Sequence, residues 1–194
     1  MTFTDLLSEV YTLTGRPDRT AETSSAIKAA TLKAHQSDYF YKDIFETGVV
    51  LDSAAFEVDI EYRTLVPRFR AMKYLRKYDL TNSAVGTFLE LIPPENVLDY
   101  FKIQKQDVYY LAGAMMHVNS STQESAYLMG CYLHPDISNF NSWIATDHPY
   151  AIIYDAAATV FKAIGKDEEA AAFRNLVGEQ MMLLRASNIV ANGF

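Results

Sequence analysis

The stretch Trp143-Ile144-Ala145-Thr146-Asp147-His148-Pro149 marks where the chain enters its last helices. Its aspartate suits a helix N-cap, and its proline suits the first helical turn, where a backbone N–H would lack a partner. Apolar residues beyond the stretch recur at helical spacing and predict a helix over residues 149–164. Gly165 is a typical helix stop, because glycine readily adopts the left-handed backbone of a C-cap. The single tryptophan is interpreted as a core anchor.

A second C-terminal helix is predicted over residues 167–186. Asp167 serves as its cap, and two glutamates follow in the first turn, where acidic side chains favour the positive end of the helix dipole. Arg185 lies near the negative end. The residues from Ser187 to Phe194 show no periodicity and predict an irregular C-terminal tail.

Helices are also predicted at the other end of the chain, over about residues 2–14 and 20–37. Thr2 suits the N-cap of the first, with Asp5 at the third helical position as in a capping box. Apolar residues recur at helical spacing in both segments. Between the terminal helices the period changes from helix to strand, and residues 48–133 form a β-rich middle.

Regular alternation of apolar and acidic residues predicts a half-buried strand over residues 56–62. Residues 48–51 are its expected hairpin partner, with Asp52-Ser53 near the turn. Alternating residues 72–78 predict a further strand.

Two more strand blocks, residues 108–113 and 126–132, are predicted with a polar turn at Asn119-Ser120-Ser121-Thr122 between them. The elements together predict the α+β class. We expect a single domain over residues 1–194, with the terminal helices packed as a bundle around a β-rich central insertion.

The composition is that of an ordinary globular protein, with 49% apolar and 21% charged residues among 194. No apolar run has the roughly 18 residues of a membrane span, and the first residues lack a positively charged leader. We therefore expect no membrane association and no secretion. Cys131 is the only cysteine, which excludes an internal disulfide and suits a reducing cytoplasm as the place of synthesis.

The formal net charge of −7 argues against general nucleic-acid binding, yet the charge is uneven. Six basic residues and no acidic one lie between residues 63 and 77. Because Pro67 interrupts this segment, we expect it to be extended and not central in a sheet. It is interpreted either as a solvated edge or as a surface that faces an acidic partner or DNA. This basic strip consists of Arg63, Arg68, Arg70, Lys73, Arg76 and Lys77.

The sequence contains no constellation typical of an active site. Cys131 has no neighbour in the sequence that would stabilise a thiolate, which favours a buried structural cysteine. His35 and Asp38 have a spacing that suits one helix face, but no second ligand pair accompanies them. We expect no catalytic residue, no cofactor and no metal site.

Three groups of segments together resemble the head-to-tail adaptor, or connector, proteins of tailed bacteriophages. The segments are Asp5-Leu6-Leu7 through Tyr11 to Arg16-Pro17 with the helix ending at His35 to Phe40; Pro67-Arg68-Phe69-Arg70-Ala71-Met72-Lys73-Tyr74-Leu75; and Tyr110-Leu111-Ala112-Gly113, Tyr132, Pro135, Ser142-Trp143-Ile144, Pro149 and Ala156-Ala157-Ala158. Adaptors of this family have terminal helices around a β-rich insertion and form a twelve-fold ring beneath the portal.

The resemblance implies a structural virion protein without an active site, located in the neck between head and tail. Its implied partners are the portal protein, tail or nozzle proteins, further copies of the chain and, in passing, the DNA in the channel. It also implies that the C-terminal tail docks into the portal, so that truncation abolishes portal binding and leaves the fold intact. The candidate assembly residues are Arg68, Arg70, Lys73, Arg76, Ile189, Val190 and Phe194.

Three alternatives remain open from the sequence. The first is a neck or tail-completion protein that contacts the tail and not the portal. The second is a small helical hydrolase, for which His35, Asp38 and Asp43 form the most suitable polar cluster. The third is a cytosolic regulatory module that binds partners through the basic strip.

Overall fold

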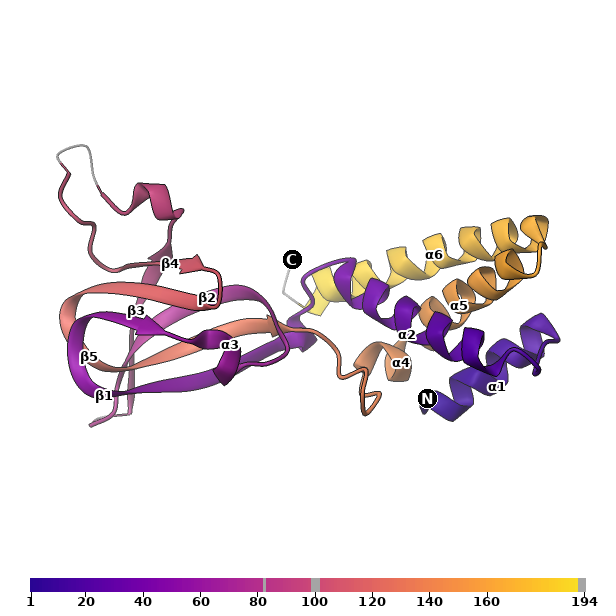
Figure 1. Ribbon diagram of the computed structural model, residues 1–194, viewed down its shortest axis with the longest axis horizontal. Coiled ribbons are helices and arrows are strands. Elements are labelled where there is room, and N and C mark those ends of the chain that lie inside the picture. The colour runs from indigo at the N-terminus through magenta and orange to yellow at the C-terminus, as the bar shows by residue number, and fades with distance from the viewer. Residues whose placement is uncertain (82, 99–101, 192–194) are drawn as a thin grey trace. The chain divides into compact units, whose positions relative to one another are not determined.

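The computed structural model describes residues 1–81, 83–98 and 102–191 (Figure 1). The predicted α+β class is confirmed, with helices at both ends of the sequence and the strands between them. Contacts between residues divide the chain into two compact units where the sequence predicted one domain. The helical unit comprises Met1–Asp43 and the segment that starts at His134. The β unit comprises Ile44–Leu133.

Helices from both termini pack against one another in the helical unit. Their observed bounds differ from the predicted ones by one residue for α1, α2 and α5, because periodicity and caps are local signals. A short 3-10 helix, η1, ends the first segment at Asp43. The elements are α1 (Phe3–Thr14), α2 (Thr20–Gln36), η1 (Tyr41–Asp43), α4 (Trp143–Asp147), α5 (Pro149–Ala163) and α6 (Asp167–Ala191).

The helix ends follow the predicted capping chemistry at Thr2 but not at the two predicted aspartate caps. Asp167 is the first residue of α6, and the Ala170 amide bonds to the Lys166 carbonyl, so Asp167 does not cap this helix. Thr2 and Asp5 form the expected capping box, in which the Thr2 side chain accepts from the Asp5 amide. Pro149 begins α5 as expected, but the N-cap position belongs to His148 and not to Asp147. Asp147 lies in the last turn of α4, where its Oδ2 accepts a hydrogen bond from Lys42 Nζ at 2.5 Å.

The core of the helical unit lies around α5, which packs against α1, α2 and α6. Ile27 of α2, Ile153 of α5 and Leu184 of α6 are fully buried there. Alanines on the facing sides of α2 and α5 are buried as well, which lets the two helix backbones approach closely. These alanines are Ala26, Ala30 and Ala34 on α2 and Ala151, Ala156 and Ala157 on α5.

The prediction of an irregular tail is wrong for residues 187–191, which continue α6 as regular helix. Asn188 explains why: its side chain is buried and accepts from the Tyr41 amide at 3.1 Å. It also donates to the Tyr39 carbonyl at 3.2 Å. Truncation at residue 187 would therefore remove contacts of the folded helical unit, contrary to the expectation that it spares the fold. Phe194 and the side chain of Val190 lie outside the described residues.

The β unit is one mixed sheet with the strand order β1-β5-β2-β3-β4. Apart from the parallel pair β3–β4, its neighbouring strands are antiparallel. Its core contains Leu75, Met116, Tyr127, Met129 and Cys131, each fully buried. The elements are β1 (Ile44–Ile60), α3 (Tyr62–Leu65), β2 (Phe69–Asp79), β3 (Ala84–Leu91), η2 (Pro94–Asn96), β4 (Val108–Ala112) and β5 (Met115–Leu133).

The long strand β5 organises this sheet (Figure 1). Residues 127–133 of β5 pair with β2, and residues 115–119 pair with β4. β2 also pairs with β3, and β3 pairs with β4. Strands β5, β2, β3 and β4 therefore form a closed circuit of pairs around the core. Within the residues that the structure describes, β1 pairs with β5 alone and is the edge of the sheet.

Two predicted turns are wrong. Residues 48–62 do not form a hairpin, since Asp52-Ser53 lies within β1 and both halves of β1 pair with β5. The polar residues 119–122 lie within β5, which is one continuous strand. The turn that joins β4 to β5 is instead Gly113-Ala114, where Gly113 has a φ of 64° that suits glycine in a two-residue hairpin loop. Polar residues were thus interpreted as turns although they lie at register irregularities of a long ribbon.

Candidate functional site

The basic strip lies on α3, on β2 and in the segment between them. The predicted strand over residues 72–78 falls within β2, but β2 is an interior strand and not a peripheral one, since it pairs with β5 and β3. The side chains of Arg68 and Lys73 are exposed, and those of Arg70 and Arg76 are half-buried. Four of the candidate assembly residues are therefore close together along one strand and the residues that precede it.

Aromatic rings support several cations of the strip. The Arg76 guanidinium lies 4.3 Å from the centroid of the exposed Phe88 ring on β3. The Lys73 ammonium lies 5.6 Å from the centroid of Tyr132 on β5. Such contacts hold the aliphatic stems in place and leave the positive charge at the surface. The strip is therefore ordered by its neighbours in the sheet.

The charge of Lys77 is engaged within the sheet. Its ammonium lies 2.7 Å from Asp107 and 3.6 Å from Glu124 of β5. Burial alone would raise the pKa of Asp107, but hydrogen bonds from Lys77 and Ser121 outweigh it and lower the pKa to about 2. Asp107 therefore stays ionised at neutral pH and neutralises Lys77.

Of the remaining candidate assembly residues, the one whose side chain the structure describes is Ile189, and it belongs to the helical unit. Ile189 is an exposed side chain of α6 in the helical unit. The structure thus divides the candidate residues into a basic set on the β unit and an apolar one on the helical unit.

A groove of about 660 Å³ lies along β1 and α3 in the β unit. Its lining includes apolar side chains and four carboxylates, with no lysine or arginine. We call it the acidic groove. Sequence reasoning missed it, although the acidic residues that alternate along residues 57–61 are its signal. The lining residues are Gly48, Val49, Val50, Leu51, Asp52, Ser53, Ala55, Glu57, Val58, Asp59, Ile60, Glu61, Thr64 and Leu65.

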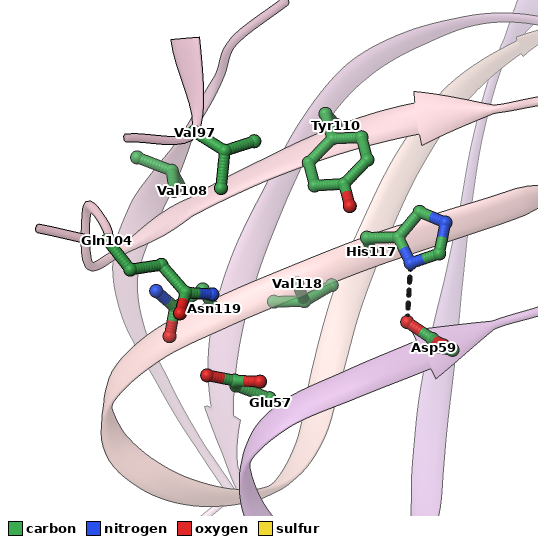
Figure 2. Close-up of a pocket in the computed structure, with 9 residues that line it drawn as sticks. All are labelled: Glu57, Asp59, Val97, Gln104, Val108, Tyr110, His117, Val118 and Asn119. Carbon is green, nitrogen blue, oxygen red and sulfur yellow. Dashed lines mark hydrogen bonds and ion pairs between the residues drawn. The ribbon is translucent and has the colours of Figure 1, made fainter. Parts of the chain in front are cut away.

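A smaller cavity of about 110 Å³ lies where β1, β4 and β5 meet (Figure 2). His117 of β5 and Asp59 of β1 are cross-strand partners there, with Nδ1 and Oδ1 2.6 Å apart. The Tyr110 ring stacks on His117 at a centroid distance of 4.7 Å. The arrangement is a cross-strand pair that fixes the register of β1 against β5. No group of three metal-ligating side chains occurs within the described residues.

A buried polar network joins three segments of the helical unit. His35 Nδ1 lies 2.9 Å from Asp43 Oδ1, and His35 Nε2 lies 2.9 Å from Ser142 Oγ. Trp143 Nε1 donates to the same Asp43 oxygen at 2.7 Å. We call Asp43, His35, Ser142 and Trp143 the buried network. It connects η1, α2 and the start of α4, as a set of hydrogen bonds that satisfies groups far apart in sequence.

The order serine–histidine–aspartate is also that of an acyl-transfer relay. In that role, however, the serine must meet a substrate, whereas Ser142 is 8% exposed and its Oγ caps α4 by accepting from the Ala145 amide. The adjacent cavity of about 100 Å³ is lined by none of the three relay residues. Its lining is Tyr41, Lys42, Trp143, His148, Ser187 and Asn188. The geometry therefore supports a structural role for the network.

The other residues considered for chemistry lie apart from this network. The Asp38 carboxylate accepts hydrogen bonds from the Asn188 side chain at 3.3 Å and from the Tyr39 amide at 2.7 Å. Asp38 therefore contacts α6 and does not form a ligand pair with His35. Burial raises the pKa of the Cys131 thiol, which keeps it protonated and unreactive.

No protein-family model matches this sequence, and a search of curated proteins finds no match either. None of the helices in the described ranges has the length and hydropathy that a membrane span requires. The assignment of a function therefore depends on the surfaces and on the resemblance of the sequence motifs.

Proposed function

We propose that this chain is a structural virion protein, a head-to-tail adaptor that forms a ring between the portal and the tail of a tailed phage. In this proposal the terminal helices form the bundle of the adaptor and the β unit is its insertion. Copies of the chain, the portal protein and tail or nozzle proteins are its partners. It acts in the neck of the virion and does not need a catalytic group.

The observation that carries the proposal is the exposure of large apolar side chains on both units. On the β unit, Val50 and Phe88 are 65% and 59% exposed, and on α6 Met182 and Leu183 are 71% and 57% exposed. Adjacent exposed apolar side chains such as Met182 and Leu183 offer a surface that an assembly can bury between subunits. Other exposed apolar side chains on the two units include Phe45, Phe56, Leu65, Val85, Leu91, Leu176 and Ile189.

The net charge also agrees with a ring through which DNA passes. A formal charge of −7 keeps the chain soluble before assembly and weakens its general attraction to DNA. The basic strip concentrates positive charge on α3, β2 and the segment between them, which suits contact with an acidic protein surface.

Mass photometry of the full chain, alone and mixed with portal rings from the same virus, tests the proposal. We expect the 21.9 kDa chain to add about a dozen copies to each portal ring, since closed symmetry sets the stoichiometry. Absence of any mass increase at micromolar concentration would contradict the adaptor proposal. Binding to purified tails in its place would identify a neck or tail-completion protein.

The relay order of Ser142, His35 and Asp43 favours a second candidate, a serine hydrolase. A fluorophosphonate probe, which labels activated serines, distinguishes it from the adaptor. We expect no labelling of the folded chain, because Ser142 is buried and caps α4. Labelling of the wild-type chain that disappears in Ser142→Ala would establish the hydrolase and contradict the structural role.

A further inference from the structure

The acidic groove follows the free edge of the sheet. β1 is the outermost strand in the order β1-β5-β2-β3-β4, and its only strand partner within the described residues is β5. Successive residues of a strand point to opposite faces, yet the run of residues 48–53 lines the groove without a gap. The register irregularity of β1 between Val50 and Glu57 accounts for this, and residues on both sides of it line the groove. The groove therefore extends along an edge strand, a position open to association.

The chemistry of the groove selects an occupant that is both apolar and positively charged. Val50 and Leu65, two of its apolar lining residues, are 65% and 49% exposed. Asp52, Glu57 and Glu61 add exposed carboxylates with no lysine or arginine among the lining residues. The fourth carboxylate, Asp59, is held by His117. An occupant with cations and rings matches this lining by charge and by apolar contact.

The basic strip has the complementary composition. Arg68 and Lys73 are exposed, and Arg76 lies against the exposed ring of Phe88. In the sheet, β5 lies between β1 and β2, so the strip and the edge groove occupy separate strands of one subunit. The two surfaces are thus different patches, as a head-to-tail contact between identical chains requires.

We propose that the acidic groove of one copy binds the basic strip of a second copy. The contact joins unlike surfaces, so each subunit keeps one free groove and one free strip, and rotation can close the series into a ring. This inference rests on the proposed function, because it identifies the contact by which copies in the ring associate. The contact is electrostatic, and association therefore weakens as salt screens the charges.

Two charge-reversed chains test the contact. The groove variant carries Asp52→Lys and Glu57→Lys, which leaves the Asp59–His117 pair in place. The strip variant carries Arg68→Glu and Lys73→Glu. We expect each variant alone to associate about tenfold or more weakly than the wild-type chain, because like charges meet at the contact. An equimolar mixture should recover association, since the reversed groove of one variant then meets the reversed strip of the other.

The readout is the mass distribution of the full chain at micromolar concentration, with and without portal rings, after circular dichroism shows the wild-type fold. Glu95→Lys with Glu179→Lys is the control, because both residues are exposed and the net charge changes as in the groove variant. Variants that associate like the wild type, or a mixture that does not recover, would overturn this contact and leave the adaptor proposal standing. A wild-type chain that associates neither alone nor on portal rings would overturn both.

Discussion

Replacement of Asp43 by alanine is expected to lower the free energy of unfolding of the chain by about 2–6 kcal/mol, because each of two buried donors that loses its partner costs about 1–3 kcal/mol. Asp43 is 7% exposed, and its Oδ1 accepts from Trp143 Nε1 and contacts His35 Nδ1. Alanine takes this acceptor from both rings at once, and buried donors that lose their partner destabilise the folded state. The single tryptophan, Trp143, lies in the network, so its fluorescence during urea unfolding reports the loss directly.

Asp147→Ala is the matched control within the helical unit. Asp147 also pairs with a basic side chain, Lys42, but both side chains are 38% exposed. Exposed pairs of this kind contribute up to about 1 kcal/mol. If Asp43→Ala lowers the free energy of unfolding no more than Asp147→Ala does, the buried network has no special role in the fold.

Two adjacent leucines of α6 are expected to respond very differently to the same substitution. Leu184→Ala should lower the free energy of unfolding by about 2–5 kcal/mol, because it opens a cavity in a packed core. Leu184 is 0% exposed, whereas Leu183 is 57% exposed. Leu183→Ala should change the free energy of unfolding by about 0.5 kcal/mol or less. Urea unfolding of both variants under one set of conditions provides the comparison.

The difference between the two leucines also tests the length of α6. If the chain beyond residue 180 were irregular, the two positions would be equivalent, and both alanine variants would unfold at nearly the wild-type urea concentration. Equal midpoints would therefore contradict the packing of the C-terminal half of α6 against the helical core.

The helices could be located from the sequence because their signals are local. The capping box at Thr2, Gly15 as the left-handed C-cap and Pro149 in the first turn each act within a few residues. The end of α6 was missed for the opposite reason. Residues 187–191 carry no apolar periodicity, and what holds them is the contact of Asn188 with Tyr39 and Tyr41, which are distant in the sequence.

The strands could be recognised one at a time, but their partners could not. The alternation of apolar and acidic residues correctly predicts a strand over residues 56–62 as far as Ile60. No local sequence signal indicates that β1 also includes Asp52-Ser53. Both halves of β1 pair with β5, whose partner residues lie 56 (Ile60 and Met116) to 88 (Ile44 and Tyr132) positions later in the chain. Polar pairs within a long ribbon look like turns in sequence, because turn-forming residues also occupy exposed strand positions.

Of the candidate surfaces, one could be located from the sequence and the others required the tertiary structure. The basic strip is visible in the sequence as a run of lysines and arginines over residues 63–77. The tertiary structure shows in addition that the rings of Phe88 and Tyr132 contact two of these cations. The acidic groove required knowledge that β1 is an edge strand. The buried network required His35 and Ser142 to meet across 107 positions of the chain.

By itself, the sequence determined the α+β class, the starts of the principal helices and the position of the basic strip, since periodicity, caps and charge runs are properties of neighbouring residues. The tertiary structure alone decided the division into two units, the edge position of β1 and the contacts of His35, Asp43 and Ser142. Those features depend on pairing between distant segments. Pairing is set by the burial of whole faces and the satisfaction of buried polar groups, which no short segment specifies.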